Sequence, residues 1–96
     1  MNSPRSFNNV CMDILGVVLF HGLKIKPTPL MSKANLMYNR LTQIFLPYLL
    51  ERGWLHKTIT YPKEYELTKE GIEQYVQFRI ESEIRENTLK RIKEIK

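Results

Sequence analysis

Asn39, Arg40 and Gln43 carry the side chains with the clearest chemical potential in this sequence. A planar Asn or Gln amide offers a donor and an acceptor, which match those on the major-groove edge of adenine. An arginine guanidinium matches guanine or a phosphate in a similar way. On a helix with 100° per residue, Asn39 and Gln43 share one face and Arg40 lies on its flank. We therefore interpret this segment as a surface that contacts a DNA duplex; an ordinary solvated helix face is the alternative.

The distribution of charge agrees with a polyanionic partner. The chain has a formal net charge of +5. Residues 1–67 hold eight Lys or Arg against four Asp or Glu, whereas residues 68–96 hold seven against six. No acidic residue lies between Asp13 and Glu51, and the basic residues of that stretch are Lys24, Lys26, Lys33 and Arg40. An acid-free segment suits phosphates, which carboxylates repel. On charge alone, a mildly basic protein with solvated lysines is an equal alternative.

Two helices must precede the segment that contains Asn39. A first helix is predicted over Pro4–His21, because apolar residues recur at the i, i+3, i+4 spacing of one buried face. Ser3 is its expected N-cap, and Gly22 is the expected left-handed residue after it. A brief second helix is predicted over Pro29–Ala34, since proline favours a first helical turn.

The third helix is expected to begin at Asn35 as N-cap and to end before Gly53. Its inward face is predicted to comprise Met37, Leu41, Ile44, Phe45, Tyr48 and Leu49. Pro47 interrupts this pattern and predicts a kink near Leu46, or a helix that breaks and restarts. Leu46 and Leu50 then project away from the inward face.

A β-hairpin is predicted after Trp54, where the hydrophobic period changes from 3.6 to two. Leu55, Ile59 and Tyr61 fall on one side of its first strand, and a turn follows with Pro62 at its second position. Lys57 and Lys63 lie on or near this hairpin, where they can reach phosphates. Ordinary surface lysines are a nearly equal interpretation.

The last segment, Thr68–Lys96, predicts one long helix of roughly 43 Å, since it contains no proline and a single early glycine. Its apolar stripe is discontinuous near Asn87, so clean heptads are not expected. A projecting helix of this length is only marginally stable in water unless another element or chain covers its apolar stripe. We expect dimerisation through Ile80, Ile84, Asn87, Leu89, Ile92 and Ile95. The chain is thus divided into a domain over residues 1–67 and a dimerisation helix over residues 68–96, which form one folded unit.

Catalysis and metal binding have no positive support in the sequence. His21 and His56 are isolated from other metal ligands, and Cys11 is expected to be a buried thiol. No cofactor, small-molecule substrate or enzymatic activity is therefore expected. A lone cysteine, no signal-peptide pattern and apolar runs far below the ~20 residues of a membrane span indicate a cytoplasmic, nucleoid location.

Several segments resemble a known family. Residues Met31-Ser32-Lys33-Ala34-Asn35-Leu36-Met37-Tyr38, then Gly53, then Tyr65-x-Leu67-Thr68-Lys69-Glu70-Gly71, resemble the archaeal winged-helix proteins of the Sulfolobus "ten-a" group. The resemblance covers roughly residues 5–96. It implies a winged helix-turn-helix whose last helix forms an antiparallel coiled coil with a second subunit. It also implies sequence-tolerant duplex binding in chromosome organisation, with Lys33, Tyr38, Asn39, Arg40 and Gln43 as the corresponding contact residues.

The sequence therefore predicts a mainly α fold with a small β-hairpin, namely a dimeric winged helix-turn-helix. The expected function is binding of double-stranded DNA, as an architectural, nucleoid-associated chromatin protein with low sequence specificity. A transcriptional regulator with a defined operator is one alternative. A protein-protein interaction module, docking through the hairpin with Leu46 and Leu50, is another.

Overall fold

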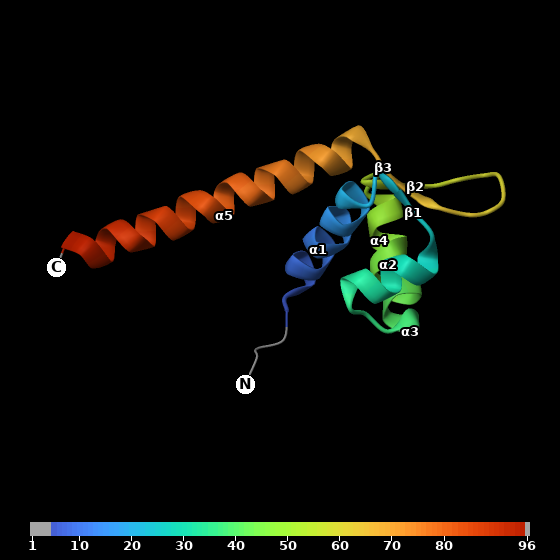
Figure 1. Cartoon of the computed structure of the whole chain (residues 1–96), viewed down its shortest axis with the longest axis horizontal. Coiled ribbons are helices and arrows are strands. Elements are labelled where there is room, and N and C mark those ends of the chain that lie inside the picture. The colour runs from blue at the N-terminus through green and yellow to red at the C-terminus, as the bar shows by residue number, and fades with distance from the viewer. Residues whose placement is uncertain (1–4, 96) are drawn as a thin grey trace.

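The computed structural model describes residues 5–95, apart from the side chain of Ile95, and shows a small head with a long projecting helix (Figure 1). The predicted cap Ser3, the predicted helix start Pro4 and the final Lys96 lie outside the described residues. In chain order, the elements are α1 (Phe7–Phe20), β1 (Lys24–Ile25), α2 (Pro27–Ala34), α3 (Tyr38–Arg40), the π-helical η1 (Leu41–Phe45), α4 (Leu46–Glu51), β2 (Leu55–Lys57), β3 (Tyr65–Leu67) and α5 (Lys69–Ile95).

Helix α1 supplies much of the core of the head. The predicted apolar face is buried over most of its length, and Met12 and Gly16 are buried beside it. The helix begins at Phe7 and not at the predicted Pro4, because Ser6 is extended and caps it: its hydroxyl accepts a hydrogen bond from the Asn9 N–H at 3.1 Å. Gly22 follows the helix with φ 100°, as predicted for a residue that must turn left-handed.

Asn35 does not begin the third helix, contrary to the prediction. It ends α2 in the left-handed region, with φ 55° and ψ 50°, and its N–H bonds to the carbonyls of Met31 and Ser32. An asparagine side chain suits either a helix N-cap or a left-handed C-cap, and here the second role prevails. Helix α2 also begins two residues early, at Pro27, and the third helical segment begins at Tyr38.

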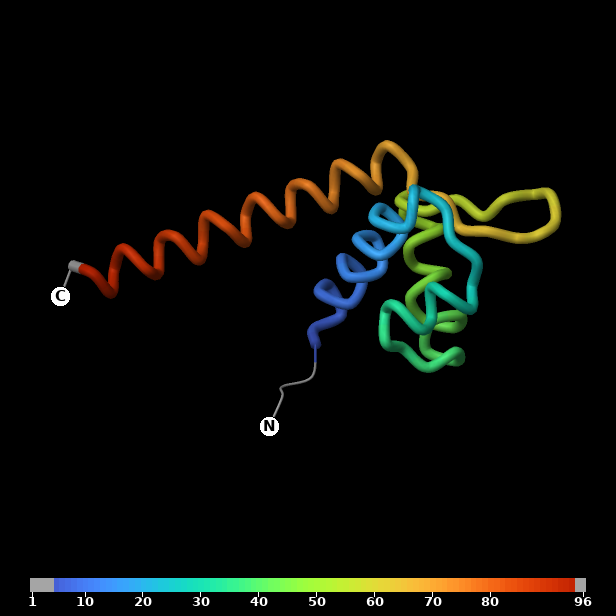
Figure 2. The backbone as a smooth tube through the Cα atoms, in the orientation of Figure 1, coloured from blue at the N-terminus to red at the C-terminus, as the bar shows by residue number. Residues whose placement is uncertain are grey.

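The third helical segment runs without a break through α3, η1 and α4 (Figure 2). Its winding changes before Pro47. In η1 the Leu46 N–H bonds to the carbonyl of Leu41, five residues back. Pro47 has no N–H to donate into this turn, and a wider π turn accommodates its ring. The extra residue per turn rotates the face that follows. Leu46 is therefore buried at 2% exposure, whereas the prediction placed it outward.

Two predicted inward residues of the same segment are exposed instead. Met37 is 76% exposed because it precedes the helix, and Ile44 is 46% exposed because the π turn carries it out of the inward face. Leu41, Phe45 and Leu49 are buried as predicted.

The predicted hairpin is part of a three-stranded antiparallel sheet with the order β1-β3-β2. Strand β1 was not expected; it pairs Lys24 with Glu66 and Ile25 with Tyr65. Leu55 enters the core, but Ile59 and Tyr61, which were predicted on its side, are exposed because β2 ends at Lys57. The loop between β2 and β3 projects from the head on the side opposite the free end of α5 (Figure 1).

Helix α5 begins where its sequence predicts. The Thr68 hydroxyl accepts a hydrogen bond from the Gly71 N–H at 3.0 Å and donates to the Gly53 carbonyl at 2.6 Å. The first turns pack on α1 through the half-buried Ile72, Tyr75 and Phe78. All side chains from residue 83 to residue 94 are exposed. Within residues 5–95, no helix has the length and hydrophobicity needed to span a bilayer.

The junction between the sheet and α5 yields a stability prediction. A Cβ added at Gly71 would lie 2.1 Å from the Trp54 carbonyl oxygen and 2.7 Å from Leu67 Cδ1, so backbone must shift to admit it. We expect Gly71→Ala to lower the free energy of unfolding by about 1–3 kcal/mol, the usual cost of overpacking. Denaturant unfolding followed by circular dichroism measures this change. Glu73→Ala, on an exposed position of the same helix, is the control, and equal stability of the two variants would contradict the prediction.

Candidate nucleic-acid interface

The exposed face of α3 and η1 presents most of the polar side chains that the sequence singles out. Tyr38, Asn39, Arg40 and Gln43 are all exposed, while Leu41 and Phe45 of the same segment are buried at 0% and 1% exposure. The two buried side chains anchor the segment, so the exposed ones sit on a fixed scaffold. In the described part of the chain, no hydrogen bond occupies the amide of Asn39 or Gln43. Both amides are available to a ligand.

Arg40 is oriented by an aromatic ring. Its Cζ lies 5.6 Å from the centroid of the Phe45 ring, one turn farther along the segment. A guanidinium held over a ring keeps its N–H donors at its edge. Stacking therefore restricts the stem of Arg40 while the donors that can bind guanine or phosphate remain available.

Tyr38 and Thr42 are the two hydroxyl-bearing residues of this segment, and they differ in the structure. The Thr42 hydroxyl donates to the Tyr38 carbonyl at 2.8 Å, a bond within the helix. Its proton is thus used internally. Tyr38 is 60% exposed, and its phenol extends the polar face toward the start of the segment.

Two apolar residues join this face that the sequence did not predict there. Met37 and Ile44 are exposed beside the polar residues, for the reasons given above. Apolar side chains in a major groove contact the thymine methyl group. Pro47 was the available signal that the register of this segment would change, but its sequence pattern does not say in which direction.

The wing, which we define as residues 55–67, carries the two predicted lysines. Lys57 Nζ lies 5.9 Å from the centroid of the Tyr65 ring, at the end of β2. The Lys63 ammonium donates to the Ile59 carbonyl near the tip of the loop. Both lysines are exposed, and they lie on an element separate from α3. The candidate interface therefore has two parts, the α3–η1 face and the wing.

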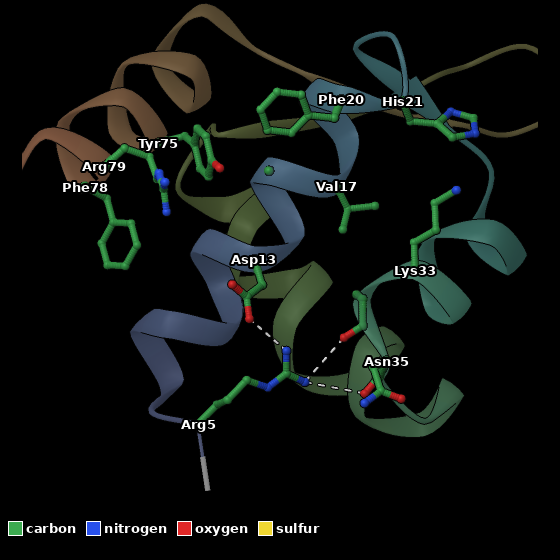
Figure 3. Close-up of a pocket in the computed structure, with 12 residues that line it drawn as sticks. Arg5, Asp13, Val17, Phe20, His21, Lys33, Asn35, Tyr75, Phe78 and Arg79 are labelled. Atoms are coloured by element: carbon green, nitrogen blue, oxygen red, sulfur yellow. Dashed lines mark hydrogen bonds and ion pairs between the residues drawn. The ribbon is translucent and has the colours of Figure 1, made fainter. Parts of the chain in front are cut away.

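Lys33 does not join either part. It lines an open cleft of about 490 Å³ between α1, α2 and α5, together with residues such as Asp13, Tyr75 and Arg79 (Figure 3). The helix that carries Lys33 was predicted from sequence, but the face to which Lys33 belongs was not. The predicted contact of Lys33 with DNA stays a prediction from the sequence resemblance.

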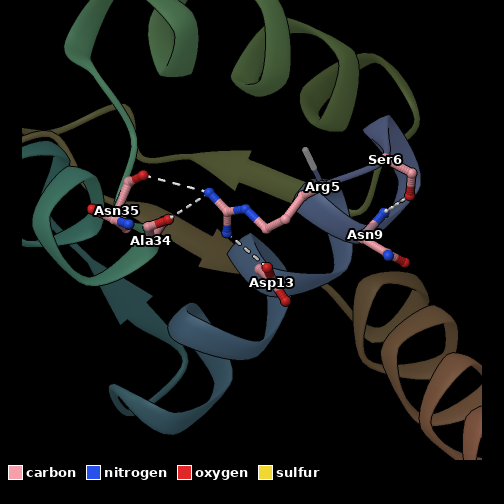
Figure 4. Close-up of polar contacts among 6 residues, drawn as sticks. All are labelled: Arg5, Ser6, Asn9, Asp13, Ala34 and Asn35. Carbon is pink, nitrogen blue, oxygen red and sulfur yellow. Dashed lines mark hydrogen bonds and ion pairs between the residues drawn. The ribbon is translucent and has the colours of Figure 1, made fainter. Parts of the chain in front are cut away.

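Arg5 positions the turn that leads into α3, and sequence reasoning missed it. Its Nη1 is 2.8 Å from Asp13 Oδ2, and its Nη2 donates to the carbonyls of Ala34 at 3.3 Å and Asn35 at 3.4 Å (Figure 4). Carbonyls at a helix C-terminus carry partial negative charge, which a guanidinium neutralises. Arg5 therefore ties the start of α1 to the end of α2.

The described residues contain no metal-binding cluster, since no group of three His, Cys, Asp or Glu side chains among them can hold a metal ion. Cys11 is buried, and burial raises its pKa to about 11, which keeps the thiol protonated and unreactive. His21 Nδ1 lies 3.0 Å from the Lys24 carbonyl oxygen, next to the turn after α1.

Comparisons with known proteins agree with this arrangement. The solved structure of Sso10a-2, a DNA-binding protein from Sulfolobus solfataricus, superposes with a TM-score of 0.75 at 23% identity. The match covers 95% of this chain and 93% of that one, and it confirms the winged-helix fold of the Sulfolobus group that the sequence resembles. A comparison with curated proteins finds no match. A family model described as "Winged helix-turn-helix" matches residues 4–93, so the chain belongs to the winged helix-turn-helix family.

Proposed function

We propose that this protein binds double-stranded DNA, with the α3–η1 face in the major groove and the wing against the flanking backbone. The observation that carries the proposal is that exposed amide and guanidinium groups lie on a stretch of the chain that contains no acidic residue. Asn39, Arg40 and Gln43 are exposed within the acid-free stretch between Asp13 and Glu51. A second acid-free stretch lies between Glu51 and Glu64 and includes most of the wing. DNA binding by Sso10a-2, which has the same fold, supports the proposal.

We assign the protein an architectural, nucleoid-associated role with low sequence specificity. The polar face is short, because the π turn ends it at Gln43 and places Ile44 next. Few side chains are thus available for base readout, so contacts to phosphates supply most of the affinity. A transcriptional regulator with a defined operator is the alternative, and it would prefer its site over random duplex by at least ~10³.

The protein-docking alternative loses part of its basis. It depended on Leu46 and Leu50 as an outward surface, but Leu46 is 2% exposed and Leu50 packs partly against the core. The exposed face of α3 and η1 carries Asn39, Arg40 and Gln43 beside Met37 and Ile44. Its amide and guanidinium groups favour phosphate and base contacts.

We further propose that α5 mediates homodimerisation. Ile84 is 60% exposed, Leu89 54% and Ile92 53%, on a part of the helix where no other element covers them. At 100° per residue, Leu89 lies about 140° around the helix from Ile84, so the apolar residues do not form one straight seam. Ile80, Ile84 and the exposed Asn87 share one face. A partner helix would therefore make an irregular coiled coil, in which Asn87 helps to fix the register.

The Ile95 side chain lies outside the described residues, so its predicted part in this interface stays a prediction from sequence alone.

Salt and charge reversal test the DNA interface. The logarithm of the association constant for random duplex should fall linearly with the logarithm of the salt concentration. The slope should be about −0.9 for each phosphate that the protein neutralises. We expect Arg40→Glu to weaken binding by about 1–3 kcal/mol, because a contact donor becomes a repelled carboxylate. Fluorescence anisotropy at several salt concentrations measures both effects.

Lys90→Glu is the matched control for this substitution, since it reverses a charge at an exposed position on α5, away from α3. Equal affinities for the two variants would refute the assignment of the α3–η1 face. Absence of binding to random duplex even at low salt would refute the architectural role.

Oligomeric state tests the role of α5. Light scattering should give about twice the 11.5 kDa chain mass, and Ile84→Glu should shift the protein to the single-chain mass, because a charge in an apolar interface is poorly solvated. Glu83→Gln changes the neighbouring exposed position and should leave the mass unaltered. A single-chain mass for the unaltered protein would remove the proposed dimer.

A further inference from the structure

The tip of the wing carries two apolar side chains that the head leaves uncovered. Ile59 is 83% exposed and Tyr61 is 91% exposed. The alternation that buries Leu55 ends with β2 at Lys57, so the loop extends beyond the edge of the core (Figure 1). Isolated exposed apolar residues are ordinary on protein surfaces. Two of them within three positions of a projecting loop form a small apolar point that a partner can bury.

Hydrogen bonds within the loop hold this point in place. The Thr58 N–H donates to the Glu64 carbonyl at 2.9 Å, and the Glu64 N–H donates back to the Thr58 hydroxyl at 2.9 Å. The Thr58 hydroxyl in turn donates to the Thr60 carbonyl at 3.4 Å, and the Lys63 ammonium donates to the Ile59 carbonyl. The loop is therefore closed by its own polar groups. A surface ordered in this way loses less conformational entropy when it binds.

The charge around the tip indicates what this partner is. No acidic residue lies between Glu51 and Glu64, and the basic residues of that stretch are Arg52, His56, Lys57 and Lys63. An apolar point flanked by cations complements a groove with phosphate walls. The minor groove of B-DNA is about 6 Å wide, which excludes a helix but admits the tip of a hairpin. Minor-groove proteins insert apolar side chains such as isoleucine between base steps while basic residues hold the phosphates.

We propose that the wing tip is a DNA-bending wedge. Ile59, with Tyr61 beside it, enters the minor groove and partly unstacks one base step, which bends the duplex by roughly 20–90° toward the major groove. The inference rests on the proposed duplex binding, because the α3–η1 face must first place the wing beside the groove. It adds a distortion of DNA that phosphate contacts from Lys57 and Lys63 alone would not produce.

A bending assay on the full chain tests the wedge. A duplex of about 25 bp, a length over which bends are measurable, carries a donor and an acceptor dye at its ends and 2-aminopurine inside. At saturation the unaltered protein should raise both the energy transfer and the 2-aminopurine fluorescence. The double variant Ile59→Ala/Tyr61→Ala should bind with the same salt dependence, because its cations are intact, yet lose most of both signals.

Phe20→Ala is the matched control, since it removes a side chain that is 80% exposed at the end of α1. It should bend the duplex as the unaltered protein does. A double variant that keeps both signals overturns the wedge, as does an unaltered protein that saturates the duplex without changing either signal. Failure of the unaltered protein to bind duplex at low salt overturns the proposed function instead, so the two failures are distinguishable.

Discussion

Pro47 has no backbone N–H, and the exposed face of the third helical segment is organised around that missing donor. The turn before it widens into η1, where Leu46 bonds five residues back to Leu41. The side chains that follow rotate with the backbone, so Leu46 enters the core and Ile44 leaves it. The same rotation limits the run of amide and guanidinium groups to residues 38–43. What this face can bind is therefore set by a residue one turn farther along the chain.

Much of the fold follows from local sequence patterns. Periodicity and capping residues place α1, α2 and α5 to within a few residues, because these signals act over one or two turns. Asn35 shows the limit of such reasoning, since the same short polar side chain suits a helix start and a left-handed helix end. Strand β1 shows another limit. It has two residues, and its partner Glu66 lies far along the chain, so no local pattern announces it.

In the candidate site too, the local sequence predicts the placement of some residues and not of others. Asn39 and Arg40 lie on the α-helical turn α3, and Gln43 lies in η1 before the face that follows has rotated; all three are exposed as their spacing predicts. Lys33 lies in a cleft whose other walls come from distant parts of the chain. Arg5 has no sequence signal at all, since its acceptors are backbone carbonyls 29 and 30 residues away. Residues whose roles depend on tertiary packing are those that the sequence leaves unassigned.

The buried Cys11 has a practical consequence for work on this molecule. It is the chain's only cysteine, and its thiol is both enclosed by the core and kept protonated by a pKa of about 11. A thiol reagent therefore modifies it only when the core opens, so the rate of modification reports how often the core opens, and no residue has to be introduced for this measurement. Conversely, a cysteine introduced at an exposed position accepts a spin label or dye selectively in the native protein. The natural sequence is thus already suited to single-site labelling.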